Sequence, residues 1–260
     1  MLVLGGTGEG HRLAELLGAH RHLRVVTSLA GRTTQHRPEG EVRRGGFGGA
    51  PGLARWLHAN APAIVVDATH PFAVQISRNA LAATELVGCP LLRLQREAWR
   101  PTAGDRWLSV PDVAAAADLL PDVGRRPLVT TGRLDLAAFT THPRCSALHL
   151  VARCVEPPTD TVPARTTVLL ARGPYAVAGE LDLLREHRID VLVTKNSGGD
   201  DTRAKLDAAR ELGLSVIMID RPPAPRGLVT LPSVAGAEQW VLGALPRGSS
   251  PARGRQSPVQ

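Results

Sequence analysis

Short apolar runs alternate along this chain with stretches whose apolar residues recur at helical spacing. Runs such as Leu2–Leu4 and Val216–Ile219 contain no charged residue, as expected for strands buried on both faces of a parallel sheet. Between such runs, Leu13, Leu16 and Leu17 give one predicted helix an apolar face. The alternation predicts an α/β fold with mainly parallel sheets.

The predicted strands fall into two groups. Those of the first half cover residues 2–4, 24–27, 64–66 and 91–94, and those of the second cover residues 128–130, 148–152, 168–170, 191–194 and 216–219. Further helices are predicted around residues 53–57 and 72–87.

The boundary between the two groups is predicted where both periodicities break. Residues 97–105 contain Trp99, Pro101 and Gly104 and match neither pattern. We therefore expect an N-terminal dinucleotide-binding domain over residues 1–98 and a C-terminal domain over residues 99–245. Residues 246–260 are rich in Pro, Ser, Gly and Arg, which predicts a disordered tail.

The net charge of +7 comes almost wholly from arginine, because Lys195 and Lys205 are the only lysines among the 260 residues. Part of the excess lies in the predicted tail, as Arg247, Arg253 and Arg255. The rest forms no concentrated basic stripe with interleaved aromatic residues, so we expect no nucleic-acid partner. An anionic small-molecule substrate suits the same charge.

The cysteines and the hydropathy of the chain indicate the expected cellular compartment. Cys89, Cys145 and Cys154 are odd in number and have no C-x-x-C spacing, which favours a reducing compartment. The strand pattern begins at Met1, leaving no room for a signal peptide, and no apolar run reaches the roughly 18 residues of a membrane span. We expect a cytoplasmic protein with no membrane partner. No zinc-type spacing, Walker A loop or G-x-S-x-G elbow is present, so no metal is expected.

A glycine-rich turn separates the first predicted strand from the first predicted helix. Its residues are Gly5, Gly6, Thr7, Gly8, Glu9 and Gly10. Glycines let a pyrophosphate approach the backbone N–H groups at a helix N-terminus, so we predict a cofactor-binding turn. The spacing fits G-x-x-G-x-G rather than G-x-G-x-x-G, and a tight turn without a ligand is the alternative.

The end of the second predicted strand bears on cofactor choice. NAD-specific domains place a carboxylate there for the ribose hydroxyls, whereas this chain continues into Ser28 and Arg32. Both side chains suit a 2′-phosphate, so we predict NADPH as the cofactor. The alternative is that Arg32 is a solvated loop residue.

Ligands of open α/β sheets bind at the carboxyl ends of strands, which directs attention to the segment after residues 64–66. Asp67 and His70 are candidates for donating or relaying a proton, and Thr69 between them is a candidate cofactor contact. The alternative is that Asp67 caps a turn and His70 is a structural hydrogen-bonding residue.

Three later strand ends carry candidate anion-binding residues. They are Thr131 and Arg133, then Arg172, and finally Lys195, Asn196 and Ser197. Lys195 could pair with a substrate carboxylate, contact a cofactor phosphate or supply a proton. Simple solvation of these side chains is the alternative.

Five segments together resemble the precorrin-6A reductase family of cobalamin biosynthesis. They are GGTGEG at 5–10, VDATHPFA at 66–73, VTTGR at 129–133, ARGPY at 171–175 and VTKNSGG at 193–199. The likeness extends over residues 1 to about 245, although His11 and Tyr175 stand where this family more often has other residues.

The resemblance implies two Rossmann-like domains with the active site in the interdomain cleft. It also implies an NADPH-dependent enzyme that reduces one double bond of the anionic tetrapyrrole precorrin-6A to give precorrin-6B. Arg133, Arg172 and Lys195 would then pair with substrate carboxylates, while Asp67, His70, Lys195 or bound water would supply the proton. Transient contact with neighbouring pathway enzymes is a further expectation.

Two alternatives stay open, a cobalt-precorrin-6A reductase and a non-catalytic NADP-binding sensor. A short-chain-like dehydrogenase does not fit, because its Tyr-x-x-x-Lys pair is absent: Tyr175 is the only tyrosine, and residue 179 is glycine.

Overall fold

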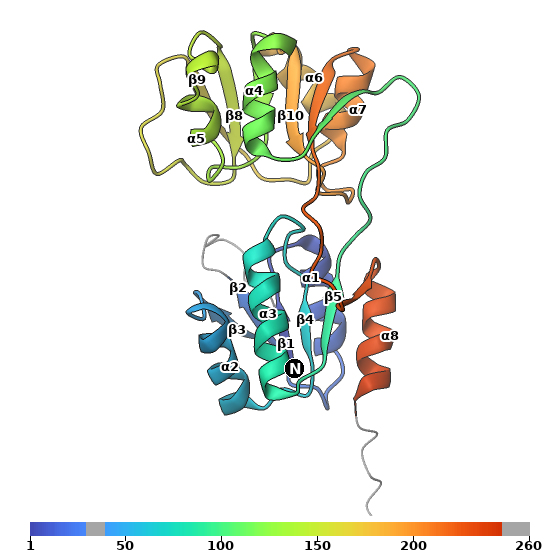
Figure 1. The fold of residues 1–260 in the computed structure, drawn as a ribbon. Helices are drawn as coiled ribbons and strands as arrows, with labels where there is room; N and C mark the ends of the chain where they lie inside the picture. The colour runs from blue at the N-terminus through green and yellow to red at the C-terminus, as the bar shows by residue number, and fades with distance from the viewer. Residues whose placement is uncertain (30–39, 246–260) are drawn as a thin grey trace, which may run out of the picture.

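The chain forms two six-stranded parallel sheets, each covered by helices on both faces (Figure 1). This arrangement comes from a computed structural model that describes residues 1–29 and 40–245. The predicted α/β class with mainly parallel sheets is confirmed. Among the described residues, no helix combines the length and apolar character needed to cross a membrane.

The first sheet has the strand order β12-β5-β4-β1-β2-β3. Its strands are β1 (Leu2–Leu4), β2 (Val26–Leu29), β3 (Glu41–Arg44), β4 (Val65–Asp67), β5 (Leu91–Leu94) and β12 (Val229–Leu231). Its helices are α1 (Gly8–Gly18), α2 (Gly49–Asn60), α3 (Val74–Val87) and α8 (Val234–Ala244). Leu13 of α1 and Val241 of α8 are buried in one core, and Leu53 of α2 and Ala80 of α3 are buried in another. The two helix pairs therefore cover opposite faces of the sheet.

The second sheet has the strand order β6-β11-β10-β7-β8-β9. Its strands are β6 (Arg106–Val110), β7 (Pro127–Val129), β8 (Leu150–Cys154), β9 (Thr166–Leu170), β10 (Val191–Lys195) and β11 (Ser215–Ile219). Its helices are α4 (Val113–Val123), α5 (Ala137–Thr140), a 3₁₀ turn (Pro143–Cys145), α6 (Val177–Glu186) and α7 (Ala204–Glu211).

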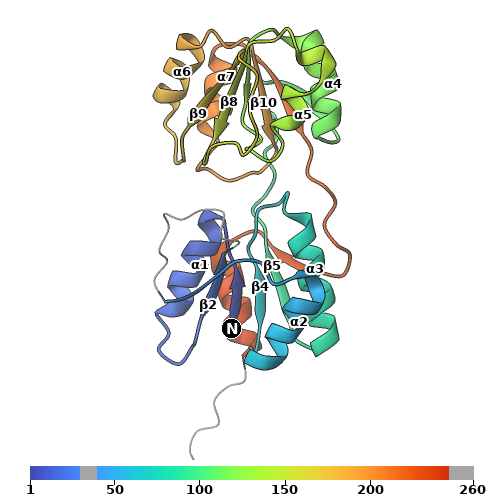
Figure 2. The same ribbon diagram turned by 90° about the vertical axis from the view of Figure 1, so that its left-hand side faces the viewer.

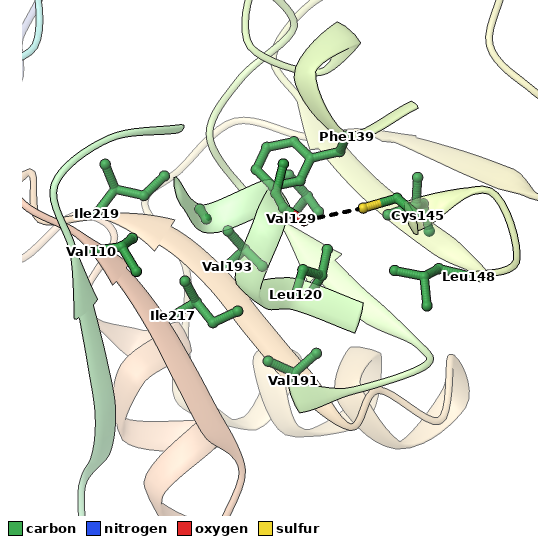
Figure 3. Packing of buried hydrophobic residues seen from close by; sticks show 13 residues of the cluster. Val110, Leu120, Val129, Phe139, Cys145, Leu148, Val191, Val193, Ile217 and Ile219 are labelled. Carbon is green, nitrogen blue, oxygen red and sulfur yellow. Dashed lines mark hydrogen bonds between the residues drawn. The ribbon is translucent and has the colours of Figure 1, made fainter. Parts of the chain in front are cut away.

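The core beneath α4 and α5 illustrates how this second half is held together (Figure 3). Leu120 of α4 and Phe139 of α5 are fully buried against Val193 and Ile217 of the sheet. The Cys145 thiol donates to the Ala117 carbonyl over 3.4 Å, so this buried sulfur has a polar partner. Small residues such as Ala117 allow the close helix–sheet approach.

The two sheets exchange one edge strand each, β6 and β12. After β5 the chain crosses into the second sheet as β6, which pairs with β11, and after β11 it returns as β12, which pairs with β5. Figure 2 shows the two crossing segments between the halves. Residues 229–244 thus pair and pack with the first sheet, although they lie within the range 99–245 predicted for the C-terminal domain. The predicted tail, 246–260, lies outside the described residues.

Each strand predicted from the sequence overlaps an observed one, but β3, β6 and β12 were not predicted. All three lie at sheet edges, where one side has no neighbouring strand. Their residues are largely exposed, and Glu41–Arg44 is mostly charged, so they lack the apolar run that marks an interior strand.

Candidate functional site

A cavity of about 590 Å³ lies at the carboxyl ends of β7, β8 and β10. Most of its lining comes from the second half, and His70 and Phe72 contribute from the first. The polar lining residues include Thr131, Arg133, Asp135, Arg153, Glu156, Tyr175, Lys195, Ser197 and Lys205. A site of this size is within the range of small-molecule and cofactor sites.

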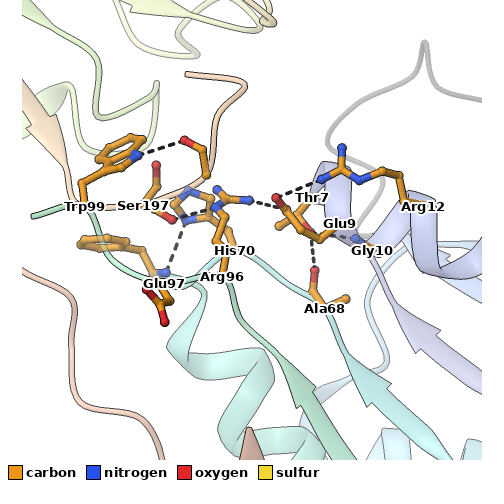
Figure 4. Close-up of polar contacts among 12 residues, drawn as sticks. Thr7, Glu9, Gly10, Arg12, Ala68, His70, Arg96, Glu97, Trp99 and Ser197 are labelled. Atoms are coloured by element: carbon orange, nitrogen blue, oxygen red, sulfur yellow. Dashed lines mark hydrogen bonds and ion pairs between the residues drawn. The ribbon is translucent and has the colours of Figure 1, made fainter. Parts of the chain in front are cut away.

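The predicted glycine-rich turn is built at the carboxyl end of β1. Thr7 is the N-cap of α1, and its hydroxyl accepts a hydrogen bond from the Gly10 N–H (3.1 Å) and donates to the Ala68 carbonyl (2.9 Å). Figure 4 shows both contacts. Gly6 has a φ of +125°, which strongly favours glycine, and a Cβ on Gly10 would lie 3.0 Å from that of Ala68. The turn is therefore held against the end of β4, and its glycines leave the backbone at the start of α1 without side chains.

This turn fits the pyrophosphate of a dinucleotide. A Cβ at Gly6 would meet nothing within 4 Å, so the backbone there faces open space. The Gly5 N–H donates to the Ser28 carbonyl (2.9 Å), which places the end of β2 beside the turn, where the ribose of a bound dinucleotide lies in Rossmann domains.

Ser28 is buried beside an arginine that sequence analysis did not single out. Its hydroxyl lies 3.5 Å from Nη1 of Arg43, and that guanidinium also donates to the carbonyls of Gly45 (2.6 Å) and Gly46 (2.7 Å). Arg43 lies on the edge strand β3. Because β3 is mostly charged and has no apolar run, neither the strand nor its arginine was predicted from the sequence. The other predicted 2′-phosphate ligand, Arg32, lies outside the described residues.

Asp67 and Thr69 point into the first half rather than into the cavity. The Asp67 carboxylate is fully buried, forms a 2.5 Å ion pair with Arg93, and accepts from the N–H (3.1 Å) and hydroxyl (2.6 Å) of Thr69. Neither residue lines the cavity. The structure thus gives Asp67 the turn-capping position that was the alternative to a proton-transfer role.

His70 does line the cavity. Its Nδ1 accepts a hydrogen bond from the Phe72 N–H (3.3 Å), which leaves the imidazole proton on Nε2. Burial lowers its pKa to about 3, helped by the positive charges of Arg96 and Lys195 among others. The ring is therefore neutral at physiological pH and acts as a hydrogen-bonding group rather than as a charged acid.

Lys195 also lines the cavity, where it forms an ion pair with Asp135. Its ammonium lies 5.2 Å from the centroid of the Phe72 ring, so a lysine of the second half rests on an aromatic side chain of the first. Asp135 was not predicted, because its position six residues after β7 carries no strand-end signal.

Three of the other predicted substrate-binding residues reach the cavity. Arg133 pairs with Glu156 (3.2 Å), while Thr131 and Ser197 are both buried in the lining. Within the described parts of the chain, the Thr131 hydroxyl has no hydrogen-bond partner. A buried hydroxyl of this kind is available to a polar ligand.

Arg172 and Asn196 do not line the cavity. Arg172 is exposed, although its neighbours Gly173 and Tyr175 belong to the lining. Asn196 instead fixes the first crossing, because its amide accepts from the Trp99 N–H (2.8 Å) and donates to the Trp99 carbonyl (3.1 Å).

An arginine of the first crossing joins the two halves above the glycine-rich turn. Arg96 forms a 2.6 Å ion pair with Glu9 of the turn and donates to the Ser197 carbonyl (2.8 Å), as Figure 4 shows. Burial alone would raise the pKa of Glu9, but the Arg96 charge helps to lower it, so the carboxylate stays ionised. Arg221 of the second crossing donates to the same Ser197 carbonyl (2.8 Å).

Two further basic residues in the cavity wall were missed by sequence analysis. Arg153 forms a buried ion pair with Glu180, and its guanidinium lies 4.1 Å from the centroid of the Tyr175 ring. Lys205 is 5% exposed, and its ammonium lies 5.1 Å from the centroid of the Trp99 ring. Arg153 lies within β8 and Lys205 lies in the first turn of α7. Neither residue follows the end of a predicted strand, so the rule that ligands bind at strand ends did not predict them.

The chain is similar over nearly its whole length to enzymes of one kind. It is 52% identical over 242 residues to a precorrin-6A reductase of Rhodococcus erythropolis, covering 93% of this chain and 96% of that protein. A cobalt-precorrin-6A reductase of Priestia megaterium is 30% identical over 241 residues, covering 88% and 93%.

A solved structure named CobK precorrin-6A reductase has the same fold, with a TM-score of 0.86 and 40% identity over 96% of this chain and 98% of that one. Residues 1–241 match the family described as Precorrin-6x reductase CbiJ/CobK. The predicted resemblance is confirmed: the chain is an oxidoreductase and belongs to the precorrin-6x reductase CbiJ/CobK family.

Proposed function

We propose that this chain reduces precorrin-6A to precorrin-6B in cobalamin biosynthesis, with NADPH as the hydride donor. The observation that carries the proposal is the cavity of about 590 Å³, which is lined by cationic side chains of one half and bounded by His70 and Phe72 of the half that bears the glycine-rich turn. Such a site can hold an anionic ring against a cofactor on the other half.

The cofactor would be held by the first half. The backbone of Gly5–Gly10 would take the pyrophosphate, and the Ser28–Arg43 pair would take the 2′-phosphate that distinguishes NADPH from NADH. NADPH, when bound, supplies a hydride to one carbon of a double bond in the substrate.

The substrate would be held by the second half. The acetate and propionate groups of a tetrapyrrole are carboxylates, and Arg133 and Lys195 are cavity-lining cations that suit them. Each already has an acidic neighbour, Glu156 and Asp135 respectively, which would orient the cation before substrate binds. The Thr131 hydroxyl adds a hydrogen-bonding group that a polar substituent can use.

We favour the cobalt-free substrate, because the chain is 52% identical to a precorrin-6A reductase and 30% identical to a cobalt-precorrin-6A reductase. The three free cysteines suit a reducing, cytoplasmic setting.

Turnover of authentic substrate tests this proposal. We expect the purified protein to oxidise NADPH, followed by loss of its absorbance, only when precorrin-6A is present, and the product mass to increase by two hydrogens. NADH and the cobalt-containing substrate serve as comparisons. A protein that binds NADPH but never oxidises it with either tetrapyrrole would be a sensor, and the proposal would be wrong.

A further inference from the structure

Lys205 occupies an unusual position for a lysine. It lies in the first turn of α7, its side chain is 5% exposed, and it lines the same cavity as His70 and Lys195. Within the described residues, no hydrogen bond or ion pair joins its ammonium to another group, and the ammonium lies 5.1 Å from the centroid of the Trp99 ring. A buried cation without a direct ion-pair partner is costly, so its presence at a cavity wall points to a role in the site.

The reaction needs such a group, because reduction of a double bond by a hydride also requires a proton. Asp67 cannot reach the cavity, since its carboxylate is enclosed by Arg93 and Thr69. His70 is held neutral, and Lys195 is paired with Asp135. Of the two ammonium groups in the described lining, Lys205 is the one that no carboxylate holds by a direct ion pair.

We propose that Lys205 is the catalytic acid of the reduction. This inference rests on the function proposed above. One carbon of the double bond receives the hydride with its electron pair from NADPH, and the adjacent carbon takes a proton from the Lys205 ammonium. NADPH leaves as NADP⁺, Lys205 is left as a neutral amine, and solvent returns its proton in the next cycle.

The surroundings of Lys205 suit an acid that must release a proton near neutrality. Burial lowers its pKa to about 7; Arg153 on β8 and Arg96 of the first crossing lower it too, while Glu180 on α6 opposes them. Glu180 keeps one buried carboxylate oxygen without a hydrogen-bond partner among the described residues, so some negative charge remains to hold the ammonium form. Catalytic acids work best with a pKa near the working pH.

The competing role for Lys205 is that of a simple clamp for a substrate carboxylate. A clamp needs only positive charge, whereas an acid must lose its proton. Arginine keeps its charge at any working pH and cannot be deprotonated, so Lys205→Arg separates the two roles, and Lys205→Met removes both.

The decisive measurement is single-turnover oxidation of bound NADPH by precorrin-6A, with the affinities for NADPH and precorrin-6A titrated separately. We expect Lys205→Met and Lys205→Arg both to lower the hydride-transfer rate by roughly 10²–10⁴-fold while NADPH affinity is unchanged. The wild-type rate should fall as the pH rises through about 7, and this step should vanish in both variants. Unchanged NADPH affinity also shows that the variants are folded.

A second readout does not depend on turnover. Because Lys195 and Lys205 are the only lysines, untagged protein labelled with ¹³C-lysine gives two Cε signals, and Lys195→Met identifies which is which. We expect the Lys205 signal to titrate near pH 7. A midpoint near the ordinary lysine value of about 10.4 would overturn the proposal.

The rates provide the other contradiction. If Lys205→Arg keeps the wild-type rate at saturating substrate, or if Lys205→Met weakens only substrate affinity, Lys205 is a clamp and not the acid. If wild type turns over and both variants do so equally fast, this inference alone fails. If wild type does not turn over at all, the proposed function fails and this inference with it.

Discussion

The two halves share one strand order but use the carboxyl ends of their sheets differently. In the first half the carboxylate at the end of β4, Asp67, is paired inside the protein with Arg93, and the turn after β1 offers glycine backbone to a ligand. In the second half the strand ends present side chains such as Arg133 and Lys195 to a cavity. Under the proposed function, one architecture provides the location for two sites, and the loops decide whether each suits a phosphate or a carboxylated ring.

The two buried ion pairs sharpen this contrast. The Asp67 carboxylate accepts from Arg93 and twice from Thr69, so both of its oxygens are satisfied. The Glu180 carboxylate pairs with Arg153, but its second oxygen has no hydrogen-bond partner within the described residues, and Lys205 lies in its field. Complete pairing is typical of a structural network, whereas incomplete pairing beside a cavity is typical of a functional one.

The largest expected effect comes from breaking the satisfied pair. Asp67→Ala leaves the Arg93 charge buried without a partner, which should lower the free energy of unfolding by about 3–5 kcal/mol, measured by urea titration. The double variant Asp67→Ala/Arg93→Met should recover part of that loss. Hydride transfer by the folded protein should persist, because Asp67 does not line the cavity. A stable Asp67→Ala protein without turnover would instead assign Asp67 to proton transfer.

His70 provides a test of intermediate size, since it belongs to the first half but faces the cavity of the second. Its folded-state pKa of about 3 lies below its ordinary value of 6.5, so between these values the unfolded chain binds more protons. Its contribution to stability is therefore complete above pH 6.5 and falls with acidification, by up to about 1.4 kcal/mol per pH unit.

Urea unfolding between pH 7 and 5 measures this effect. His70→Gln should show a shallower loss of stability than wild type, while His149→Gln, which alters an exposed histidine, should follow wild type. Equal pH dependence in wild type and His70→Gln would show that His70 is not buried as described.

The smallest expected effect concerns the side chains that the first half offers to a cofactor. Arg43→Ala should weaken NADPH binding about 10-fold, or roughly 1.4 kcal/mol, with little change for NADH, because only NADPH carries the 2′-phosphate. Arg24→Ala is a matched control, since that exposed arginine pairs with Glu41 on the same edge strand. Equal losses for both cofactors would place Arg43 outside the 2′-phosphate site. Fluorescence titration of each variant gives the affinities.

The sequence was most informative where burial on both faces leaves a continuous apolar run, as in residues 191–193 and 216–219. It was least informative at edges, where β12 has only three residues and two of them are exposed. The exchange of last strands could not be predicted either, because adjacency along the chain favours pairing β6 with the strand just before it.

For the site, the sequence identified segments but not partners. The strand-end rule predicted Asp67, His70 and Lys195, yet Arg93, which binds Asp67, is 26 residues away from it along the chain. In the sequence, Lys205 lies within a polar helical stretch and resembles an ordinary surface residue. Only the packing of α7 in the folded protein buries it in the cavity wall, near Arg153 and Trp99. Partners of this kind depend on tertiary contacts, which periodicity does not encode.

The exchanged strands also set an order of events on the ribosome. Residues 106–219 contain every strand of the second sheet and can pair as soon as they have emerged, but the first sheet lacks β12 until residue 231 has been made. Until then the edge of β5 is open and the apolar face later covered by α8 is bare, and both features favour association with other chains. The nascent protein thus exposes an edge and an apolar face for association with other chains from the time β5 has formed until residues 229–244 have been made.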